Sequence, residues 1–302
     1  MLLDSASMYF RAFFGVPEIK AADGTPVNAV RGFMDFISRL VTEYDPSHLV
    51  CCWDDDWRPQ WRVDLLPSYK AHRVVTEVAK GPDVEEVPDP LEVQVPIIVE
   101  VLEAFGICRV GAPHAEADDV IGTLATGAGR PVDVVTGDRD LFQLVDDEAA
   151  VRVLYIARGV SKHERVDNAW VREKYGIDAR QYADFATLRG DASDGLPGVA
   201  GVGDKTAATL LGRFGDMAGI RAAVADPDSD LGPGPRGKLK AAADYLEVAP
   251  RVVAVSRDLD LGLREKDMRR PVTPADPAKV QALAERYDLE SPSARLVEAL
   301  MR

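Results

Sequence analysis

The stretch "VDVVTGDRD", Val132 to Asp140, decides the fold. A short valine-rich run ends in a glycine turn that carries two aspartates, Asp138 and Asp140. Two other apolar runs also end on aspartate, "MLLD" at Asp4 and "HLVCCWD" at Asp54. Short apolar runs separated by segments with helical spacing, such as "VRGFMDFISRLVTEY", are typical of buried parallel strands. We therefore predict an α/β fold with a mostly parallel central sheet flanked by helices.

The three strand-end aspartates are expected to converge, because ligands of open α/β sheets bind beyond the carboxyl ends of the strands. From about Trp170 the sequence changes to helices with glycine turns. We therefore divide the chain into an α/β body, 1–170, and a helical region, 171–302. Within the body, about 70–97 is rich in proline, glycine and acids, which predicts an irregular excursion.

The composition is that of an ordinary globular protein, with 302 residues, 46% of them hydrophobic and 28% charged. No apolar run approaches the roughly 18 residues that cross a bilayer, and the N-terminus lacks signal-peptide features. The three cysteines form no metal pair and no disulfide framework. We expect a cytoplasmic protein without a membrane partner. Its net charge of −14 argues against nucleic acid unless basic residues cluster locally.

Carboxylates cluster at further places besides the strand ends. Glu116, Asp118 and Asp119 fall in the first turn of a predicted helix, where a spacing of three puts Glu116 and Asp119 on one face. Asp191 and Asp194 repeat that spacing before a glycine-rich segment. The full set of candidate metal ligands is Asp4, Asp54, Glu116, Asp118, Asp119, Asp138, Asp140, Asp191 and Asp194.

So many carboxylates in one crevice would repel each other without cations. Oxygen ligands and the lack of a His or Cys cluster favour Mg²⁺ or Mn²⁺ over zinc. Two or more such ions would hold the oxygens of a phosphodiester, so we predict metal-dependent phosphodiester hydrolysis. The alternative for any single acid is a solvated residue at a helix start, which the helix dipole favours.

A basic stretch follows the second strand, "DDDWRPQWRVDLLPSYKAHR", Asp54 to Arg73. It mixes cations with aromatic rings, a combination suited to phosphates and unpaired bases. For Lys70 and Arg73 we favour contact with phosphate. The alternative is a helix with core aromatics and arginines that reach along apolar surface. The candidate nucleic-acid contacts in this stretch are Arg58, Arg62, Tyr69, Lys70 and Arg73.

The segment "LPGVAGVGDKTAATLL", Leu196 to Leu211, suggests phosphate binding. The nucleotide P-loop pattern G-x-x-x-x-G-K-[ST] fails here by one residue, because Asp204 stands before Lys205, and no strand precedes it. A helix-hairpin-helix at about 188–215 fits better. Its turn would expose backbone N–H groups at a helix N-terminus that holds a duplex phosphate without reading bases. The contacts predicted there are Gly201, Gly203, Lys205 and Thr206.

Together these motifs resemble the 5′-nuclease family, which includes flap endonucleases and the N-terminal nuclease domain of bacterial DNA polymerase I. The matching motifs are "LLD", "WDDD", "YKAHR", "AEADDVIGTLA", "TGDRDLFQLV" and "GDASDGLPGVAGVGDKTA". They cover roughly the first 215 residues in the family's order. The resemblance implies a PIN-like nuclease fold with a helical arch at about 70–97 and a helix-three-turn-helix that grips duplex DNA.

The resemblance also implies roles for individual residues. It places Lys70 and Arg73 at the scissile phosphate, and we assign catalysis to these two with Asp119 and Asp138. It implies the nine metal ligands above, and a K⁺ ion at the hairpin as a secondary expectation. The run "DDDWRPQWR" is one residue longer than the family's usual spacing, so Asp54, Asp55 or Asp56 could be the ligand. We favour Asp54 because it ends the apolar run.

The sequence therefore predicts a stand-alone, monomeric 5′ nuclease, both 5′-3′ exonuclease and flap endonuclease, that acts in replication and repair. Its substrates would be DNA with a 5′ flap, a nick or a 5′ end, and RNA–DNA hybrids, in the nucleoid. One alternative is a relative that binds branched DNA without cutting it. The other is an ATPase that uses the glycine-rich segment.

Overall fold

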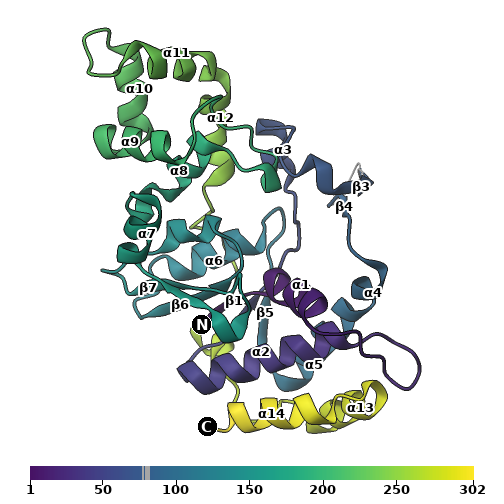
Figure 1. The fold of residues 1–302 in the computed structure, drawn as a ribbon. Helices are drawn as coiled ribbons and strands as arrows, with labels where there is room; N and C mark the ends of the chain where they lie inside the picture. The colour runs from purple at the N-terminus through teal and green to yellow at the C-terminus, as the bar shows by residue number, and fades with distance from the viewer. Residues whose placement is uncertain (77, 79–81) are drawn as a thin grey trace.

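The computed structural model describes residues 1–76, 78 and 82–302, and a six-stranded sheet forms its centre (Figure 1). Five strands run parallel, and only β8 is antiparallel, to β7. In sheet order the strands are β5 (Cys108–Val110), β2 (Val50–Cys52), β1 (Leu2–Asp4), β6 (Val132–Thr136), β7 (Val151–Tyr155) and β8 (Glu164–Val166). The prediction of a mostly parallel central sheet is confirmed.

The chain order reverses at β1. It runs outward through β2 and β5 on one side and through β6 and β7 on the other. Ligands of such sheets bind where the order reverses, beyond the carboxyl ends of the strands. Asp4 ends β1, and Asp138 follows β6 by two residues. The topology therefore brings the two aspartates to one crevice.

Helices cover both faces of the sheet, and the strand side chains alternate between two apolar cores. Leu3 and Val135 face a core shared with α2 and α5, whereas Leu2 and Val134 face a core shared with α6. The helices of the body are α1 (Ser5–Gly15), α2 (Asn28–Tyr44), α3 (Gln60–Leu65), α4 (Asp89–Glu92), α5 (Gln94–Phe105) and α6 (Ala117–Ala125). The sheet is thus buried on both sides.

A helical region lies at the top of Figure 1. Its helices are α7 (Asn168–Tyr175), α8 (Tyr182–Arg189), α9 (Asp204–Phe214), α10 (Met217–Ala225), α11 (Pro233–Ala241) and α12 (Ala243–Val253). Helix α8 packs on α9 and α12. Short 3₁₀ helices also occur between these elements, at Ala71–Arg73, Asp140–Leu144, Val160–Lys162, Ala179–Gln181, Ala192–Asp194 and Glu265–Met268.

The last two helices, α13 (Pro277–Tyr287) and α14 (Glu290–Leu300), do not join that region. They pack on α5 and α2 of the body, at the foot of Figure 1. The prediction that 171–302 forms one helical region is therefore wrong for these helices. Their apolar residues, such as Leu296 and Leu300, complete the core of the body.

The predicted helical arch at about 70–97 is wrong for 74–76 and 84–85, which form strands. Strands β3 (Val74–Thr76) and β4 (Val84–Glu85) form an antiparallel ribbon, and the one-turn helix α4 follows. The β-branched run 74–76 favours a strand, and the prolines between 82 and 90 interrupt helices. Residues 77 and 79–81 of the predicted arch lie outside the described residues.

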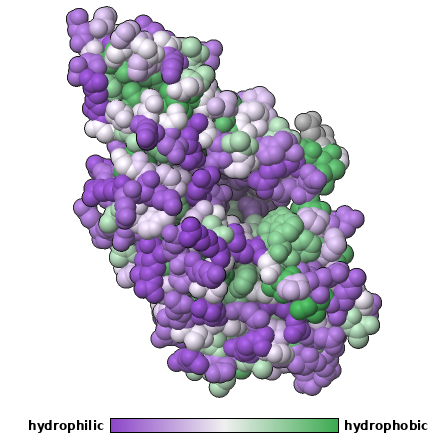
Figure 2. Space-filling model, in the orientation of Figure 1, coloured by the Kyte–Doolittle hydropathy of each residue, from purple (hydrophilic) through white to green (hydrophobic). Residues whose placement is uncertain are grey.

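Among the helices that the structure describes, none has both the length and the apolar character needed to cross a membrane. The face shown in Figure 2 is mainly hydrophilic and is hollowed between the helical region above and the body below.

Candidate active site

A hydrogen-bonded chain joins the aspartates at the ends of β1 and β6. Asp4 is buried, and its two carboxylate oxygens accept from the Ser7 N–H (3.1 Å) and the Thr136 hydroxyl (2.6 Å). The same hydroxyl oxygen accepts from the Asp138 N–H (2.9 Å). Sequence reasoning missed Thr136, although it is the last residue of the strand that leads to Asp138 and therefore lies at the same edge of the sheet.

The structure distinguishes the three aspartates of "WDDD". Asp54 Oδ1 accepts from the Ala117 N–H at the start of α6 (2.8 Å). Burial, together with the charges of Asp4 and Glu116, raises the pKa of Asp54 to about 7, against the lowering effect of the Ala117 N–H. Asp55 instead lies at the surface near Arg109, and Asp56 accepts from the backbone of Arg58. The geometry therefore groups Asp54 with the acids of β1 and α6.

Two of the acids at the start of α6 belong to the same cluster. Glu116 is buried and precedes the helix, and Asp118 lies in its first turn. Burial raises the pKa of Asp118 well above its usual value, and Asp138, Asp4 and Glu116 add to that effect. The Asp118 carboxyl therefore favours the protonated form unless a cation compensates its charge.

Asp119 and Arg62 have a different role from the one predicted. Arg62 Nη1 and Nη2 donate to the two oxygens of Asp119 (2.7 Å each), and Arg62 Nε donates to the Val252 carbonyl (3.0 Å). Arg62 is 2% exposed and Asp119 is fully buried. Although burial alone would raise the pKa of Asp119, Arg62 lowers it.

Two predictions about this pair are wrong for that reason. Arg62 has no surface that could reach DNA, and Asp119 has no oxygen left for a metal ion or a reacting group. Arg62 instead also holds Glu116, with Nη1 3.1 Å from Oε1. The pair joins α3, α6 and the end of α12 below the acidic cluster.

Arg58 and Tyr69 are also buried, and internal partners occupy the Arg58 guanidinium and the Tyr69 hydroxyl, so their prediction as DNA contacts is wrong. Arg58 donates to the Tyr69 carbonyl (2.7 Å) and pairs with Asp83 (2.6 Å). The Tyr69 hydroxyl donates to Glu116 Oε1 (2.7 Å). The contacts of both side chains fix the position of the segment that leads to Lys70.

Lys70 and Arg73 border the acidic cluster. The Lys70 ammonium pairs with Glu116 Oε2, and the backbone N–H of Lys70 donates to the Asp194 carbonyl (3.0 Å). Burial alone would lower the pKa of Lys70, but Glu116 outweighs it and the pKa is raised. Arg73 is partly exposed, pairs with Glu85 of β4 and lies over the Trp57 ring, 5.3 Å from its centroid.

A second acidic group consists of Asp140, Asp191 and Asp194. Burial raises the pKa of Asp140 well above its usual value, and Asp138, Asp194 and Asp191 add to that effect. Burial likewise raises the pKa of Asp194 to about 6, against the effect of Lys70. Asp140 Oδ1 is buried and has no hydrogen-bond partner within the described residues.

Two arginines that sequence reasoning missed approach this group. Asp191 Oδ2 lies 3.2 Å from Arg189 Nη2 and 3.5 Å from Arg139 Nη2. Arg139 lies between Asp138 and Asp140 in the sequence, so its position next to two predicted metal ligands could have been noted from the sequence. Its contact with Asp191 depends on the tertiary fold.

The donor set suits a hard divalent ion. All candidate ligands are carboxylates, several have raised pKa values, and the buried Asp140 Oδ1 lacks a partner among the described residues. In the part of the chain that the structure describes, no three His, Cys, Asp or Glu side chains stand close enough to enclose an ion as they are. Ion binding would therefore draw these carboxylates together.

The glycine-rich segment links α8 to α9. Gly198 and Gly201 have φ angles of 66° and 70°, a conformation that favours glycine. Gly203 caps α9, and Lys205 is exposed in the first turn of that helix. Lys238 of α11, which sequence reasoning missed, donates to the Gly201 carbonyl (2.8 Å). The segment follows a helix, as expected for a helix-hairpin-helix and not for a P-loop.

This fold, with acids across the carboxyl edge of its sheet, defines an α/β nuclease. The family "5'-3' exonuclease, N-terminal resolvase-like domain" matches residues 1–176, and "5'-3' exonuclease, C-terminal SAM fold" matches residues 177–276. The chain therefore belongs to the 5′-3′ exonuclease family.

Similar proteins agree with that membership. A Streptomyces coelicolor 5′-3′ exonuclease is 59% identical over 301 residues, covering 99% of each chain. A Mycobacterium tuberculosis 5′-3′ exonuclease is 54% identical, covering 99% of this chain and 97% of its own. The T5 D15 protein, solved with metal ions, has a TM-score of 0.64 at 17% identity, covering 99% of this chain and 98% of that one. At that identity the structural likeness shows the fold.

Proposed function

We propose that this protein is a divalent-metal-dependent, structure-specific 5′ nuclease, active as a 5′-3′ exonuclease and as a 5′-flap endonuclease. The observation that carries the proposal is the acidic cluster at the carboxyl edge of the sheet, with its raised pKa values and an unpartnered buried oxygen on Asp140. We propose as metal ligands Asp4, Asp54, Glu116, Asp118, Asp138, Asp140, Asp191 and Asp194.

The residues around the cluster have separate tasks in this proposal. Bound Mg²⁺ or Mn²⁺ supplies Lewis-acid activation of water and neutralises charge at the scissile phosphate. Lys70 and Arg73 donate to the oxygens of that phosphate once their contacts with Glu116 and Glu85 are exchanged. The Thr136 hydroxyl fixes the Asp4 carboxylate relative to the Asp138 backbone, because it hydrogen-bonds to both.

The hairpin between α8 and α9 would hold the duplex, away from the cut. Gly201, Gly203, Lys205 and Thr206 would face the backbone of the DNA, with Lys238 beside them. The helix N-terminus and the Lys205 charge favour a phosphate, and K⁺ is the monovalent ion we propose there. The substrates would be 5′ flaps, nicks, 5′ ends and RNA–DNA hybrids of the nucleoid. The protein would act in the cytoplasm as a monomer.

Cleavage of a labelled 5′-flap substrate during Mg²⁺ and Mn²⁺ titrations tests the proposal. We expect Asp138→Asn and Asp140→Asn to abolish cleavage, while both variants still bind the substrate. Asp55→Asn removes an equal charge from an exposed aspartate outside the cluster and should cut like the wild type. If the wild type binds the flap substrate but never cuts it, the protein is a family member that only binds branched DNA.

The hairpin is tested by its salt dependence. Lys205→Ala should weaken duplex binding equally for all sequences and lower the slope of log affinity against log salt by about one. Lys266→Ala removes the same charge far along the chain and should leave the slope unchanged. An unchanged slope for Lys205→Ala as well would mean that the hairpin does not touch phosphate.

A further inference from the structure

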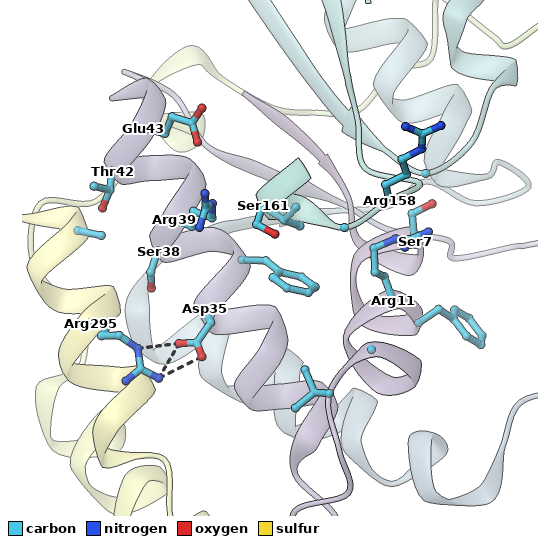
Figure 3. A pocket seen from close by; sticks show the side chains of 18 of the residues that line it. Ser7, Arg11, Asp35, Ser38, Arg39, Thr42, Glu43, Arg158, Ser161 and Arg295 are labelled. Atoms are coloured by element: carbon cyan, nitrogen blue, oxygen red, sulfur yellow. Dashed lines mark hydrogen bonds and ion pairs between the residues drawn. The ribbon is translucent and has the colours of Figure 1, made fainter. Parts of the chain in front are cut away.

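Helix α1 lines two cavities of opposite charge. Arg11, Arg39 and Arg158 line the one in Figure 3. The other has a volume of about 1010 Å³ and lies between α1, the β3–β4 ribbon and α4. No Lys, Arg or His of the described residues lines this second cavity, which we call the acidic cavity. The carboxylates in its walls are Asp54, Asp83, Glu85, Glu86, Asp89 and Glu92.

The acidic cavity adjoins the proposed site of cutting. Asp54, a proposed metal ligand, lines it. Glu85 of β4 also lines it and pairs with Arg73, which we place at the scissile phosphate. The Glu86 N–H donates to the Arg73 carbonyl (2.9 Å), so the backbone of the ribbon is fixed beside that arginine. A single strand that extends from Arg73 along the ribbon therefore enters the acidic cavity.

Three of the carboxylates in the cavity keep their full charge. Glu86, Asp89 and Glu92 are exposed, and none of them pairs with a cation of the described residues. Glu85, by contrast, has Arg73 as its partner. Arg73 can therefore hold one phosphate beside the cavity, in exchange for Glu85. Each further phosphate would face unpaired carboxylates, and like charges within a few ångströms repel each other strongly.

Aromatic rings form another part of the cavity wall, at Tyr9, Phe10, Phe14, Trp53 and Trp57. The Tyr9 and Trp53 rings pack with their centroids 5.7 Å apart, and Phe14 is 73% exposed. An exposed ring offers a stacking surface to any base, but it does not neutralise a phosphate. The cavity thus suits the base of a single nucleotide better than a chain of phosphates.

We infer that the acidic cavity limits the length of the 5′ single strand that this nuclease accepts, and that Glu86, Asp89 and Glu92 are the specificity-determining residues. The inference rests on the proposed function. A 5′ end, a nick or a flap of one nucleotide places few phosphates in the cavity, whereas a long flap places many there. The preferred substrates are therefore 5′ ends, nicks and the shortest flaps.

The test compares kcat/KM in Mg²⁺ for two substrates that share one duplex. One carries a flap of one nucleotide and the other a flap of about ten nucleotides, each of which adds a phosphate charge. The test variant of the full chain is Glu86→Gln/Asp89→Asn/Glu92→Gln. The control variant is Glu148→Gln/Asp258→Asn/Glu285→Gln, which removes the same charge from exposed acids outside the cavity.

We expect the wild type to cut the short flap with the higher kcat/KM. The test variant should raise kcat/KM for the long flap about tenfold, because the repulsion is removed, and should leave the value for the short flap unchanged. The control variant should keep the wild-type ratio of the two values. Circular dichroism checks that both variants fold.

The salt dependence of the wild type gives a second test that needs no variant. Salt screens exposed charges, so a higher salt concentration should raise the ratio of long-flap to short-flap kcat/KM. Contacts with the shared duplex weaken equally for both substrates and cancel in this ratio.

The inference is overturned if the wild type cuts the long flap as well as the short one, if its ratio does not change with salt, or if the test and control variants have the same ratio. In each of these cases the DNA is still cut, so the proposed function stands. If the wild type cuts neither flap in Mg²⁺ or Mn²⁺, the proposed function itself fails.

Discussion

Arg62 shows how one buried side chain organises the acidic cluster. Its guanidinium spans Asp119, Glu116 and the Val252 carbonyl, and lies 4.5 Å from the centroid of the Trp61 ring. Asp119 also accepts from the Ser256 N–H (2.7 Å). Glu116 is thus held between Arg62 and Lys70, which fixes the angle at which it faces the crevice. Arg62 is a positioning residue.

Replacement of Arg62 by methionine should be strongly destabilising. It leaves the buried charge of Asp119 without a partner, and breaking a buried ion pair from one side costs about 3–5 kcal/mol. Urea denaturation measures the free energy of unfolding. Arg165→Met, which removes an exposed pair with Glu43, should cost at most about 1 kcal/mol. Equal small losses for the two variants would contradict the role of Arg62.

The raised carboxyl pKa values predict an unusual pH dependence for the metal-free protein. The pKa is about 7 for Asp54 and about 6 for Asp194, whereas unfolded carboxyls titrate near 4. The folded state therefore binds more protons than the unfolded state between about pH 4 and pH 7. The free energy of unfolding should fall as the pH rises through this range.

Melting temperatures in EDTA at pH 5 and pH 7.5 test this dependence. We expect the lower value at pH 7.5, and Mg²⁺ should restore stability there because it binds the ionised carboxylates. Asp54→Asn, which cannot ionise, should reduce the difference between the two pH values. A metal-free wild type that is more stable at pH 7.5 would contradict the prediction.

At the scale of elements, one tight turn fixes Lys70 against the second acidic group. Gly195 has a φ of 69°, and its carbonyl accepts from the Ser68 hydroxyl (2.8 Å). A Cβ at Gly195 would stand 2.0 Å from the Ser68 carbonyl oxygen. The turn that carries Asp194 and the segment that carries Lys70 therefore lie backbone to backbone.

Gly195→Ala should displace that segment and lower both stability and flap cleavage. Gly215→Ala is a matched control, because Gly215 also has a positive φ, 86°, but nothing within 4 Å of its added Cβ. The free energy of unfolding of the control should fall only by the cost of a non-glycine residue at positive φ, about 1–2 kcal/mol. Its cleavage rate should stay the same. Equal cleavage by the two variants would show that the close approach at Ser68 is unimportant.

The sequence predicted the elements that local patterns define. Asp4, Asp54 and Asp138 end or follow apolar runs, and chain periodicity was enough to group them. The sequence could not predict the role of Arg62. One of its hydrogen-bond partners, the Val252 carbonyl, is 190 residues away along the chain and meets it only in the folded protein. The sequence reasoning assigned Arg58, Arg62 and Tyr69 to a DNA-binding surface, whereas tertiary packing buries them. The helical arch came from family resemblance, and the local valines and prolines contradict it.

At the scale of the whole molecule, the C-terminal helices complete the N-terminal body. Helix α14 packs along α2, and Arg295 donates to both oxygens of Asp35 (2.9 and 3.0 Å). Leu296 is fully buried in the core that Leu3 and Phe33 share. Stability of the nuclease body therefore depends on residues outside the family-matched region, 1–276.

Leu296→Ala should lower the free energy of unfolding by about 2–5 kcal/mol, the cost of a large-to-small change in a core. Met301→Ala is the control, because Met301 is 65% exposed, and it should change stability by no more than about 0.5 kcal/mol. Urea denaturation of both variants gives the comparison. A small effect at Leu296 would mean that α14 is only loosely attached to α2.

The pairing of α2 with α14 has a consequence for synthesis. Asp35 and Arg295 are separated by 260 positions, so α2 has no partner until the residues of α14 have been translated. Domains generally fold from the N-terminus while the ribosome elongates the chain, and partly formed cores are prone to aggregation. We expect the apolar face of α2 to need protection during that interval, and the body to reach its final packing only once α14 has emerged from the ribosome.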